Sequence, residues 1–343
     1  MTKYVIPRLT NLEQLKSCQT PKELLNTLGQ PTWLFLRGKS NEKCYVITTL
    51  LHGNEPSGTY ATLQLLQEGF QPEADTWILI ASVNTALTRP IFSHRMLKRN
   101  ADLNRCFSKN RNKEETDTYA LASAIIDDIE EFQPSAIADV HNTSGSGPGF
   151  CVAPSDSTYL DHLESFANLF TRTLVLTDIH LGAIMEHDFG GPIITVECGG
   201  NHAPESHELA YRGFKKFLSL PTIQDMPRAN KFTTYRHPLR LEIKEGYYLN
   251  YASEFQLGSD LTLRHEIESL NFGTTPSNKN LGWLGPEGLD GLQVLNDQGQ
   301  DLVHDYFHEI DGELHPKNPL HLFMVTKNLE IAVSDCLFYF CEE

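Results

Sequence analysis

The chain has 343 residues, which at roughly 150 residues per domain predicts one large domain or two of moderate size. With 40% hydrophobic and 21% charged residues, its composition is that of a folded globular protein and excludes a disordered or fibrous chain. The net charge of −16 argues against a general binder of nucleic acid or of anionic membranes, which would carry a basic surface.

The sequence also predicts the cellular compartment of the protein. No apolar run approaches the roughly 20 residues of a membrane span, and the first residues lack the apolar core of a signal peptide. The seven cysteines are odd in number, scattered, and contain no C-x-x-C pair. We therefore expect a cytoplasmic protein with free, mostly buried thiols.

The first two thirds of the chain predict alternating strands and helices. Strands are expected at Thr32–Leu36, Cys44–Leu51, Thr76–Val83, Ala136–Val140 and Pro192–Val196, and helices at Pro56–Phe70, Asp117–Phe132 and Glu205–Leu218. Such alternation favours an α/β fold, a mostly parallel sheet with helices on both faces.

The pattern changes after Pro221, where short β-like runs are separated by Gly, Pro and Asn. These runs are Arg240–Ile243, Gly246–Leu249, Leu320–Val325, Glu330–Val333 and Cys336–Phe340. We therefore predict an α/β domain over residues 1–225 and a smaller β-rich domain over residues 226–343.

Positive charge gathers in one segment of this acidic chain. Between Arg89 and Lys113 there are eight Lys or Arg residues and a single acid, Asp102. A solvated basic loop would explain this. A segment that recognises anions would explain it too, since Arg supplies the two-pronged donor that a carboxylate or phosphate requires. Within it, Asn104 and Arg105 offer an amide and a guanidinium suited to a substrate carboxylate, whereas Asp102 is expected to tether the loop or a neighbouring Arg.

Two predicted strands end close to histidines. The strand Cys44–Leu51 leads into His52-Gly-Asn-Glu55, where a turn can bring imidazole and carboxylate onto one ion, and Ala136–Val140 leads into His141. Ligands usually bind at the carboxyl ends of strands in an α/β sheet. Two His and one Glu are a ligand set of catalytic zinc sites. The alternative is that these are ordinary hydrogen-bonded residues at strand ends.

A third strand end supplies a carboxylate, Glu197, followed by Cys198 and two glycines. A Glu that does not bind the metal is what metal-assisted hydrolysis needs to take a proton from water and deliver it to the leaving nitrogen. Capping of the glycine turn is the alternative. The segment from His202 to His207 imitates a metal site, but its Pro204 and the helix that follows favour helix capping and surface exposure.

The motifs H-G-N-E-P-S-G, D-L-N-R-C-F, D-V-H-N-T and V-E-C-G-G, in this order, resemble the succinylglutamate desuccinylase/aspartoacylase family of the zinc carboxypeptidase-like superfamily. The resemblance covers about residues 45–220. It implies that His52, Glu55 and His141 bind one Zn²⁺ per chain and that Glu197 is the general base and acid. It also implies that Asn104 and Arg105 hold the substrate carboxylate, and that the second domain is small and β-rich.

The chain departs from the family pattern at two places. The family's oxyanion-stabilising Arg falls on Leu97 here, so Arg99 or Arg95 is expected to take that role, with Arg99 preferred. The family's aspartoacylases also carry an Arg shortly before the catalytic Glu, and the stretch His180–Gly190 contains none. N-acetylaspartate is therefore not the expected substrate.

Together these patterns predict a zinc-dependent hydrolase that cleaves the amide bond of a small anionic N-acyl amino acid, without nucleic-acid or membrane partners. The oligomeric state, including a homo-oligomer, stays open. Two alternatives remain: a metallocarboxypeptidase acting on short peptides, and a catalytically inactive protein that binds acidic metabolites.

Overall fold

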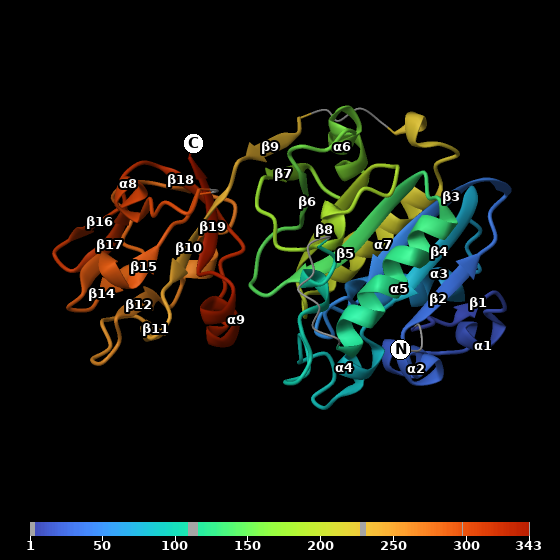
Figure 1. The fold of residues 1–343 in the computed structure, drawn as a ribbon, viewed down its shortest axis with the longest axis horizontal. Helices are drawn as coiled ribbons and strands as arrows, with labels where there is room; N and C mark the ends of the chain where they lie inside the picture. The colour runs from blue at the N-terminus through green and yellow to red at the C-terminus, as the bar shows by residue number, and fades with distance from the viewer. Residues whose placement is uncertain (1–3, 109–115, 227–230, 297, 343) are drawn as a thin grey trace. The chain divides into compact units, whose positions relative to one another are not determined.

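The computed structural model describes residues 4–108, 116–226, 231–296 and 298–342. It divides into two compact units (Figure 1). The first comprises Met1–Asn142 and Gly149–Thr234, and the second comprises Thr143–Pro148 and Tyr235–Glu343. Within the described residues no helix has the length and apolar character to cross a bilayer.

The first unit is built on a nine-stranded sheet in the order β1-β2-β4-β3-β5-β8-β6-β7-β9. The strands are β1 (Arg8–Leu9), β2 (Thr32–Leu36), β3 (Ser40–Thr49), β4 (Ala74–Ile80), β5 (Ala136–Thr143), β6 (Phe150–Pro154), β7 (Thr173–Thr177), β8 (Ile193–Gly200) and β9 (Thr233–Arg236). The helices are α1 (Glu13–Lys16), α2 (Pro21–Leu28), α3 (Ser57–Gln67), α4 (Val83–Leu87), α5 (Asp117–Phe132), α6 (Leu160–Ala167) and α7 (Pro204–Leu218). The predicted α/β architecture is confirmed.

The sheet is mixed, and its central strands are parallel. β3 runs parallel to both β4 and β5, while β2 is antiparallel to β4 and β6 is antiparallel to β8. Because β3 and β5 are parallel, their carboxyl ends lie at the same edge of the sheet. The residues that follow β3 and the residues at the end of β5 are therefore neighbours.

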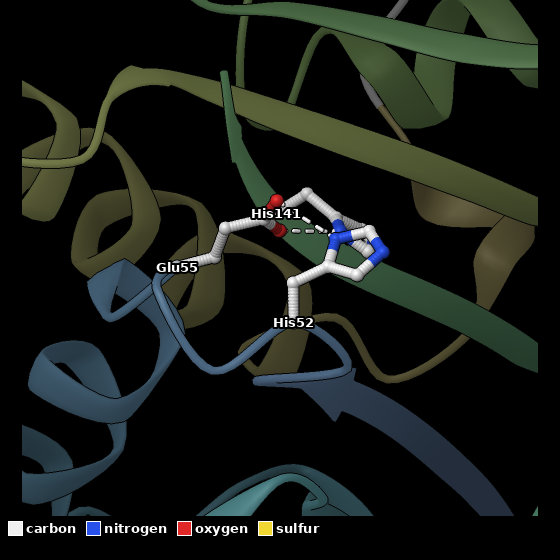
Figure 2. Close-up of side chains that lie close together, drawn as sticks. All are labelled: His52, Glu55 and His141. Carbon is white, nitrogen blue, oxygen red and sulfur yellow. Dashed lines mark hydrogen bonds and ion pairs between the residues drawn. The ribbon is translucent and has the colours of Figure 1, made fainter. Parts of the chain in front are cut away.

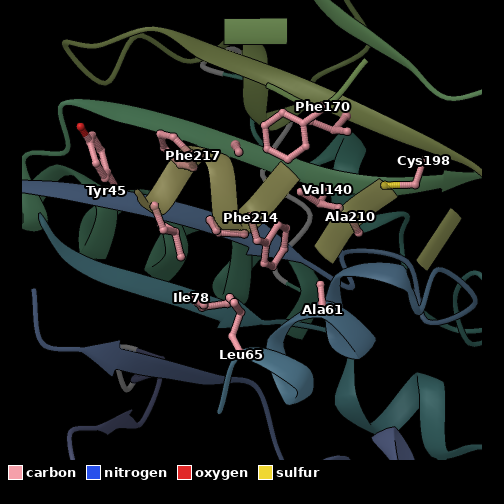
Figure 3. Packing of buried hydrophobic residues seen from close by; sticks show 14 of the residues in the cluster. Tyr45, Ala61, Leu65, Ile78, Val140, Phe170, Cys198, Ala210, Phe214 and Phe217 are labelled. Atoms are coloured by element: carbon pink, nitrogen blue, oxygen red, sulfur yellow. The ribbon is translucent and has the colours of Figure 1, made fainter. Parts of the chain in front are cut away.

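Alternation along the strands divides the apolar side chains between two faces. On one face, residues such as Ile47 and Ile78 pack in a core with α3 and α7. Figure 3 shows part of this core, where the rings of Tyr45 and Phe217 lie 4.7 Å apart. On the other face, the next residue along each strand, such as Val46, packs in a core with α5. The sheet is thus buried on both sides, as its nearly continuous apolar strands indicate.

A close approach between α3 and β3 positions the segment that joins them. A Cβ atom at Gly58, the second residue of α3, would lie 1.8 Å from the Thr49 hydroxyl at the end of β3. No side chain fits there. Glycine lets the first turn of α3 pack directly against the strand end, which holds the intervening residues 50–56 in a tight loop.

The second unit contains two five-stranded sheets, in the orders β13-β18-β19-β10-β15 and β11-β12-β14-β17-β16. The strands are β10 (Leu239–Ile243), β11 (Leu249–Ala252), β12 (Leu261–Arg264), β13 (Thr274–Thr275), β14 (Gly282–Leu284), β15 (Leu292–Gln293), β16 (Phe307–Ile310), β17 (Glu313–Pro316), β18 (Leu320–Phe323) and β19 (Phe338–Glu342). Two short helices, α8 (Val303–Tyr306) and α9 (Leu329–Ser334), accompany them. This unit has its own core, rich in Leu and Phe.

Some sequence-based assignments differ from the structure. The run Glu330–Val333, predicted as a strand, belongs to α9, because the Asn328 side chain accepts hydrogen bonds from the backbone N–H groups of Glu330 and Ile331 and so starts a helix. The strand predicted at Gly246–Leu249 begins only at Leu249. β6, β7 and α6 were not predicted from the sequence pattern. None of the seven cysteines, all of which lie in the described residues, forms a disulfide, and six of them are buried.

Candidate metal centre

Three side chains from two segments meet at the carboxyl edge of the first unit's sheet. His52 and Glu55 lie in the loop between β3 and α3, and His141 lies near the end of β5. All three are buried, and their candidate ligand atoms lie within 4.8 Å of one another (Figure 2). Among the described residues this is the one group of three or more His, Cys, Asp or Glu with such geometry.

Both imidazoles face the Glu55 carboxylate through the same ring nitrogen. His52 Nδ1 lies 2.8 Å from Glu55 Oε1, and His141 Nδ1 lies 2.6 Å from Glu55 Oε2. Burial alone would raise the pKa of Glu55, but the adjacent charges of His52 and His141 outweigh it and hold that pKa well below its usual range. The Glu55 carboxylate is therefore a buried anion that requires positive charge beside it.

Each imidazole is also held from its far side by a carboxylate. His52 Nε2 lies 2.9 Å from Asp102 Oδ1, and His141 Nε2 lies 2.8 Å from Asp139 Oδ2. A carboxylate that accepts the Nε2 proton leaves the Nδ1 lone pair for a cation and fixes the orientation of the ring. Burial opposes protonation of His141, yet Asp139 and Glu55 raise its pKa well above the usual value.

Asp139 also belongs to the centre, although it was not among the site residues predicted from the sequence. It is fully buried, and the Thr48 hydroxyl donates to its Oδ1 at 2.7 Å. A signal was present in the sequence, because residues two apart on a strand point to the same face. Asp139 therefore lies on the same side of β5 as His141.

Glu197, on β8, is buried close to the three side chains. Burial raises its pKa to about 7, and the charges of His141, Glu55 and His52 all act on it. Its Oε2 is buried and has no hydrogen-bond partner among the described residues. A buried oxygen without a partner is costly unless water or an ion meets it.

The donor set fits a zinc ion. Two neutral imidazole nitrogens and one carboxylate oxygen are ligands that catalytic zinc sites use, with a further position left for water. The anionic Glu55 and the unpartnered Glu197 Oε2 both suit a site that holds a cation and a water molecule. The residues could therefore bind the metal that the sequence predicted.

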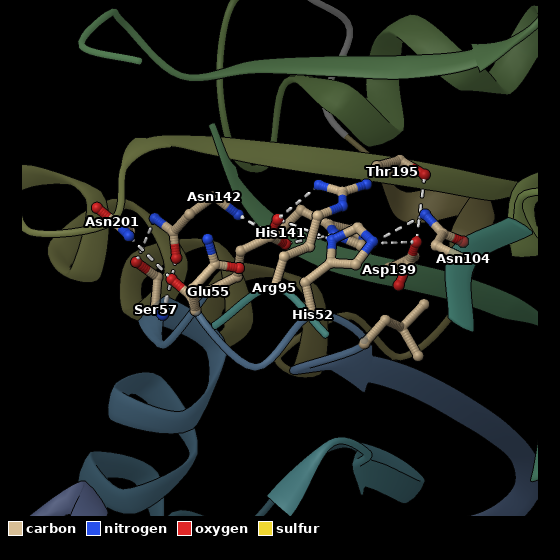
Figure 4. A network of polar contacts seen from close by, with 12 residues as sticks. His52, Glu55, Ser57, Arg95, Asn104, Asp139, His141, Asn142, Thr195 and Asn201 are labelled. Atoms are coloured by element: carbon tan, nitrogen blue, oxygen red, sulfur yellow. Dashed lines mark hydrogen bonds and ion pairs between the residues drawn. The ribbon is translucent and has the colours of Figure 1, made fainter. Parts of the chain in front are cut away.

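The structure places Arg95, rather than Arg99, at this centre. Arg95 Nη2 lies 2.9 Å from Asp102 Oδ2. Arg95 Nη1 lies 3.7 Å from Glu55 Oε1 (Figure 4). Arg99 is exposed. The expected tethering role of Asp102 agrees with these contacts, because its carboxylate joins Arg95 to His52 and also accepts from the Asn104 backbone N–H at 2.9 Å.

Asn104 and Arg105 lie in a 3₁₀ turn, Leu103–Arg105, beside the centre. Asn104 is buried, and its Oδ1 accepts from the Ile184 backbone N–H at 3.0 Å. Its Nδ2 lies 3.4 Å from His141 Nε2, whose proton goes to Asp139, so the Asn104 amide hydrogens are not taken up by His141. Arg105 is half-buried. The further cations at Lys109, Arg111 and Lys113 lie outside the described residues.

The segment before α7 departs in part from the expectation of capping and exposure. His202 is exposed as expected, and the residue before α7, Ala203, makes no side-chain cap. His207, in contrast, is half-buried, and its Nδ1 lies 2.8 Å from the hydroxyl of Ser57 at the start of α3. The reason is that α3 and α7 pack side by side, which turns this face of α7 toward the loop that carries Glu55.

No protein-family model matches the chain, and no curated protein matches it in sequence. Solved structures do resemble it. A succinylglutamate desuccinylase from Vibrio parahaemolyticus is 16% identical with a TM-score of 0.55, and the match covers 90% of this chain and 86% of that one. A succinylglutamate desuccinylase/aspartoacylase from Rhodobacter sphaeroides is 17% identical with a TM-score of 0.54, covering 86% and 82%.

Murine aminoacylase 3 is also similar, with 13% identity, a TM-score of 0.54, and coverage of 89% of this chain and 96% of that one. These likenesses extend over most of the chain, whereas the sequence motifs cover about residues 45–220. The fold of the chain is therefore that of the succinylglutamate desuccinylase/aspartoacylase structures, and the predicted resemblance is confirmed at the level of fold.

Proposed function

We propose that the chain is a zinc-dependent hydrolase that cleaves the amide bond of an N-acyl amino acid or a similar small molecule bearing a carboxylate. The observation that carries the proposal is the convergence of His52, Glu55 and His141, with the outer nitrogen of each imidazole held by a carboxylate. The names of the similar structures, a desuccinylase and an aminoacylase among them, support the reaction class.

His52 Nδ1, His141 Nδ1 and a Glu55 oxygen would hold the metal. A zinc ion bound there supplies Lewis acidity, which polarises a substrate carbonyl and makes water nucleophilic near neutral pH. Asp102 and Asp139 keep the two imidazoles in the tautomer that presents Nδ1, and they balance part of the added positive charge.

Glu197 is the proposed proton carrier. Its buried, unpartnered Oε2 is free to accept a proton from the attacking water, and the same carboxyl group can then protonate the leaving nitrogen. A pKa raised to about 7 by burial suits a group that must both take and release a proton near neutral pH, and a bound cation would lower that pKa toward the ionised state.

Arg95 is the better placed of the two candidates to stabilise the developing oxyanion, since its guanidinium lies near Glu55 and Arg99 is exposed. The Asn104 amide hydrogens and the Arg105 guanidinium are proposed to orient the substrate carboxylate. The stretch from His180 to Gly190 holds no Arg for a second carboxylate on the substrate, which argues against N-acetylaspartate.

A hydrolysis screen tests the proposal. Protein reconstituted with zinc would be incubated with N-acyl amino acids that differ in acyl group and in amino acid, and with short peptides as a separate panel. We expect release of free amino acid from the first panel, and loss of that release in Glu197→Gln. Cleavage of peptides alone would identify a metallocarboxypeptidase. Stoichiometric binding of acidic metabolites without turnover would identify an inactive binding protein.

A further inference from the structure

The side chain of Asn142, next to His141, joins three segments of the first unit. Asn142 is buried, with 3% of its surface exposed. Its Oδ1 accepts from the backbone N–H of Ser57 at 3.0 Å, and its Nδ2 donates to Ser57 Oγ at 2.8 Å and to the Gly199 carbonyl at 2.9 Å. The end of β5 is thus bonded to the start of α3, where Figure 4 shows Asn142 beside Ser57, and also to the end of β8.

The orientation of this carboxamide is determined by its backbone partners. The Ser57 N–H can only donate, so the atom facing it is Oδ1, and the Gly199 carbonyl can only accept, so the atom facing it is Nδ2. The two orientations of the Asn142 amide are therefore not equivalent. Replacing either end of the amide by an apolar group would leave a buried backbone group unpaired.

The network extends to the half-buried His207. Ser57 Oγ, which accepts from Asn142 Nδ2, also lies 2.8 Å from His207 Nδ1. Burial and the nearby His202 lower the pKa of His207, which favours the neutral ring. The ring of Tyr60 stacks on His207 with centroids 4.1 Å apart.

The segments that Asn142 joins are those that carry the proposed chemistry. Ser57 lies two residues after Glu55, and Gly199 lies two residues after Glu197. In addition, the backbone N–H of Asn142 lies 3.3 Å from Glu55 Oε2. Displacement of either segment would move a ligand carboxylate or the proton carrier relative to the two imidazoles.

We infer that Asn142 is a positioning residue, which holds the Glu55 loop and the Glu197 strand end at a fixed distance from the metal site through its carboxamide. This inference rests on the proposed function, since it assumes that Glu55 binds a metal ion and that Glu197 works beside it.

Zinc affinity, measured by competition with a chromophoric chelator on the full chain, tests the inference. Asn142→Ala should weaken zinc binding by about 10–100-fold, the range usual for groups that orient metal ligands. Ser57→Ala removes only the hydroxyl and keeps both backbone bonds of Asn142, so its loss should be clearly smaller. Asn201→Ala is the control, because Asn201 Nδ2 donates to the Asn54 carbonyl at 3.0 Å and so links the Glu55 loop to the end of β8 without the bond to β5 that Asn142 provides. Its loss of zinc affinity should be clearly smaller than that of Asn142→Ala.

A spectroscopic measurement gives a second readout that a general loss of stability would not produce. In protein labelled with ¹⁵N-histidine, the His207 Nδ1 signal reports the hydrogen bond that this nitrogen shares with Ser57 Oγ. In Asn142→Ala, where Ser57 Oγ loses a donor, this signal should shift, whereas in Asn201→Ala it should stay that of the wild type. Should Asn142→Ala not fold, Asn142→Asp carries the same comparison, because it offers no donor to Ser57 Oγ or to Gly199.

Equal zinc affinity in Asn142→Ala and Asn201→Ala would overturn the inference, and so would an equal loss in Ser57→Ala and Asn142→Ala, which would assign the effect to the hydroxyl. These outcomes are distinct from failure of the proposed function. A wild type that binds zinc but hydrolyses no N-acyl amino acid would refute the reaction and leave the comparison of zinc affinities intact.

Discussion

Two buried glutamates lie at the centre, and their surroundings differ. Glu55 faces two imidazoles at hydrogen-bond distance, whereas Glu197 Oε2 has no partner among the described residues. A carboxylate that faces two histidines suits the proposed metal binding, and one without a partner among the described residues suits proton transfer.

Glu197→Gln should therefore keep the metal and lower turnover at least about 100-fold, the range of general acid–base groups, because an amide cannot accept the proton. Glu55→Gln should instead lose the metal, since a carboxylate ligand and its charge are removed. Elemental analysis and steady-state kinetics on the same preparations check both expectations. Metal loss in Glu197→Gln, or its near-normal turnover, would contradict the assignment.

Asp139 provides a second prediction. Asp139→Asn keeps the shape of the side chain and the bond from Thr48, but it replaces the charge that faces His141 Nε2. Zinc affinity should fall by about 10–100-fold. Thr48→Val is the control, because it removes one neutral donor to Asp139 and leaves the carboxylate, so its effect should be smaller. A chelator competition in which Asp139→Asn matches the wild type would exclude the orienting role.

The sequence predicted the residues that converge on the candidate metal centre, but not the residues that orient their side chains. His52, Glu55, His141 and Glu197 follow strands at one edge of a parallel arrangement, and that placement can be inferred from pattern. The face that Asp139 shares with His141 could be inferred as well. The hydrogen bond from Thr48 to Asp139, and those that Asn142 makes with Ser57 and Gly199, could not be, because they join segments that are far apart in sequence.

Among the elements, the segment between α4 and the 3₁₀ turn at Leu103 decides which arginine reaches the centre. Arg95 bonds to Asp102 and lies near Glu55, while Arg99 is exposed. Counting from the D-L-N-R motif placed the family's arginine on Leu97, two residues from either candidate. The conformation of an irregular segment, which has no period to read, cannot be derived from such spacing.

A pair of substitutions tests this placement. Arg95→Ala should lower kcat by about 10²–10³-fold, the loss typical for removal of a donor to a developing oxyanion. Arg99→Ala should stay close to the wild type, because an exposed cation contributes little. Both variants would be assayed at saturating zinc, with metal content measured, so that loss of metal is not mistaken for loss of catalysis. A larger effect in Arg99→Ala would restore the sequence-based preference.

The short helix α9 is a second element that the sequence pattern did not predict correctly. The run Glu330–Val333 has the β-branched residues of a strand, but Asn328 caps the first turn and Val333 is 54% exposed. A strand inside a sheet would have buried that side chain. Capping by Asn328 therefore outweighs the β propensity of the run Glu330–Val333. A run of four residues is too short for its pattern to show which of the two effects prevails.

For the whole molecule, the change of pattern after Pro221 predicted a second, β-rich part, and the structure has such a unit from Tyr235. It did not predict that Thr143–Pro148, directly after Asn142, belongs to that unit as well. The reason is a set of long-range contacts. Asn271 Nδ2 donates to the Ser146 carbonyl at 2.7 Å, and a Cβ at Gly145 would lie 2.1 Å from the Val325 carbonyl oxygen. Such contacts have no signature in the local sequence.

The separate cores lead to a prediction about metal removal. His52, Glu55 and His141 all lie in the first unit, and none of the three belongs to the core of the second unit. A ligand that binds only the folded state stabilises it by about 4 kcal/mol when its free concentration is 1,000 times Kd. For a unit of this size, each kcal/mol corresponds to about 2–4 °C.

Calorimetry of the full chain should therefore show that a chelator lowers the transition of the first unit by about 8–16 °C and leaves that of the second unit in place. The variant His52→Ala serves as the control: its first transition should already be low and should not respond to the chelator, because the site has lost a ligand. A joint fall of both transitions would mean that the units unfold together. If zinc is removed from the wild type and the transitions do not change, the metal does not stabilise the fold. That result would contradict the assignment of the buried, converging side chains to a metal site.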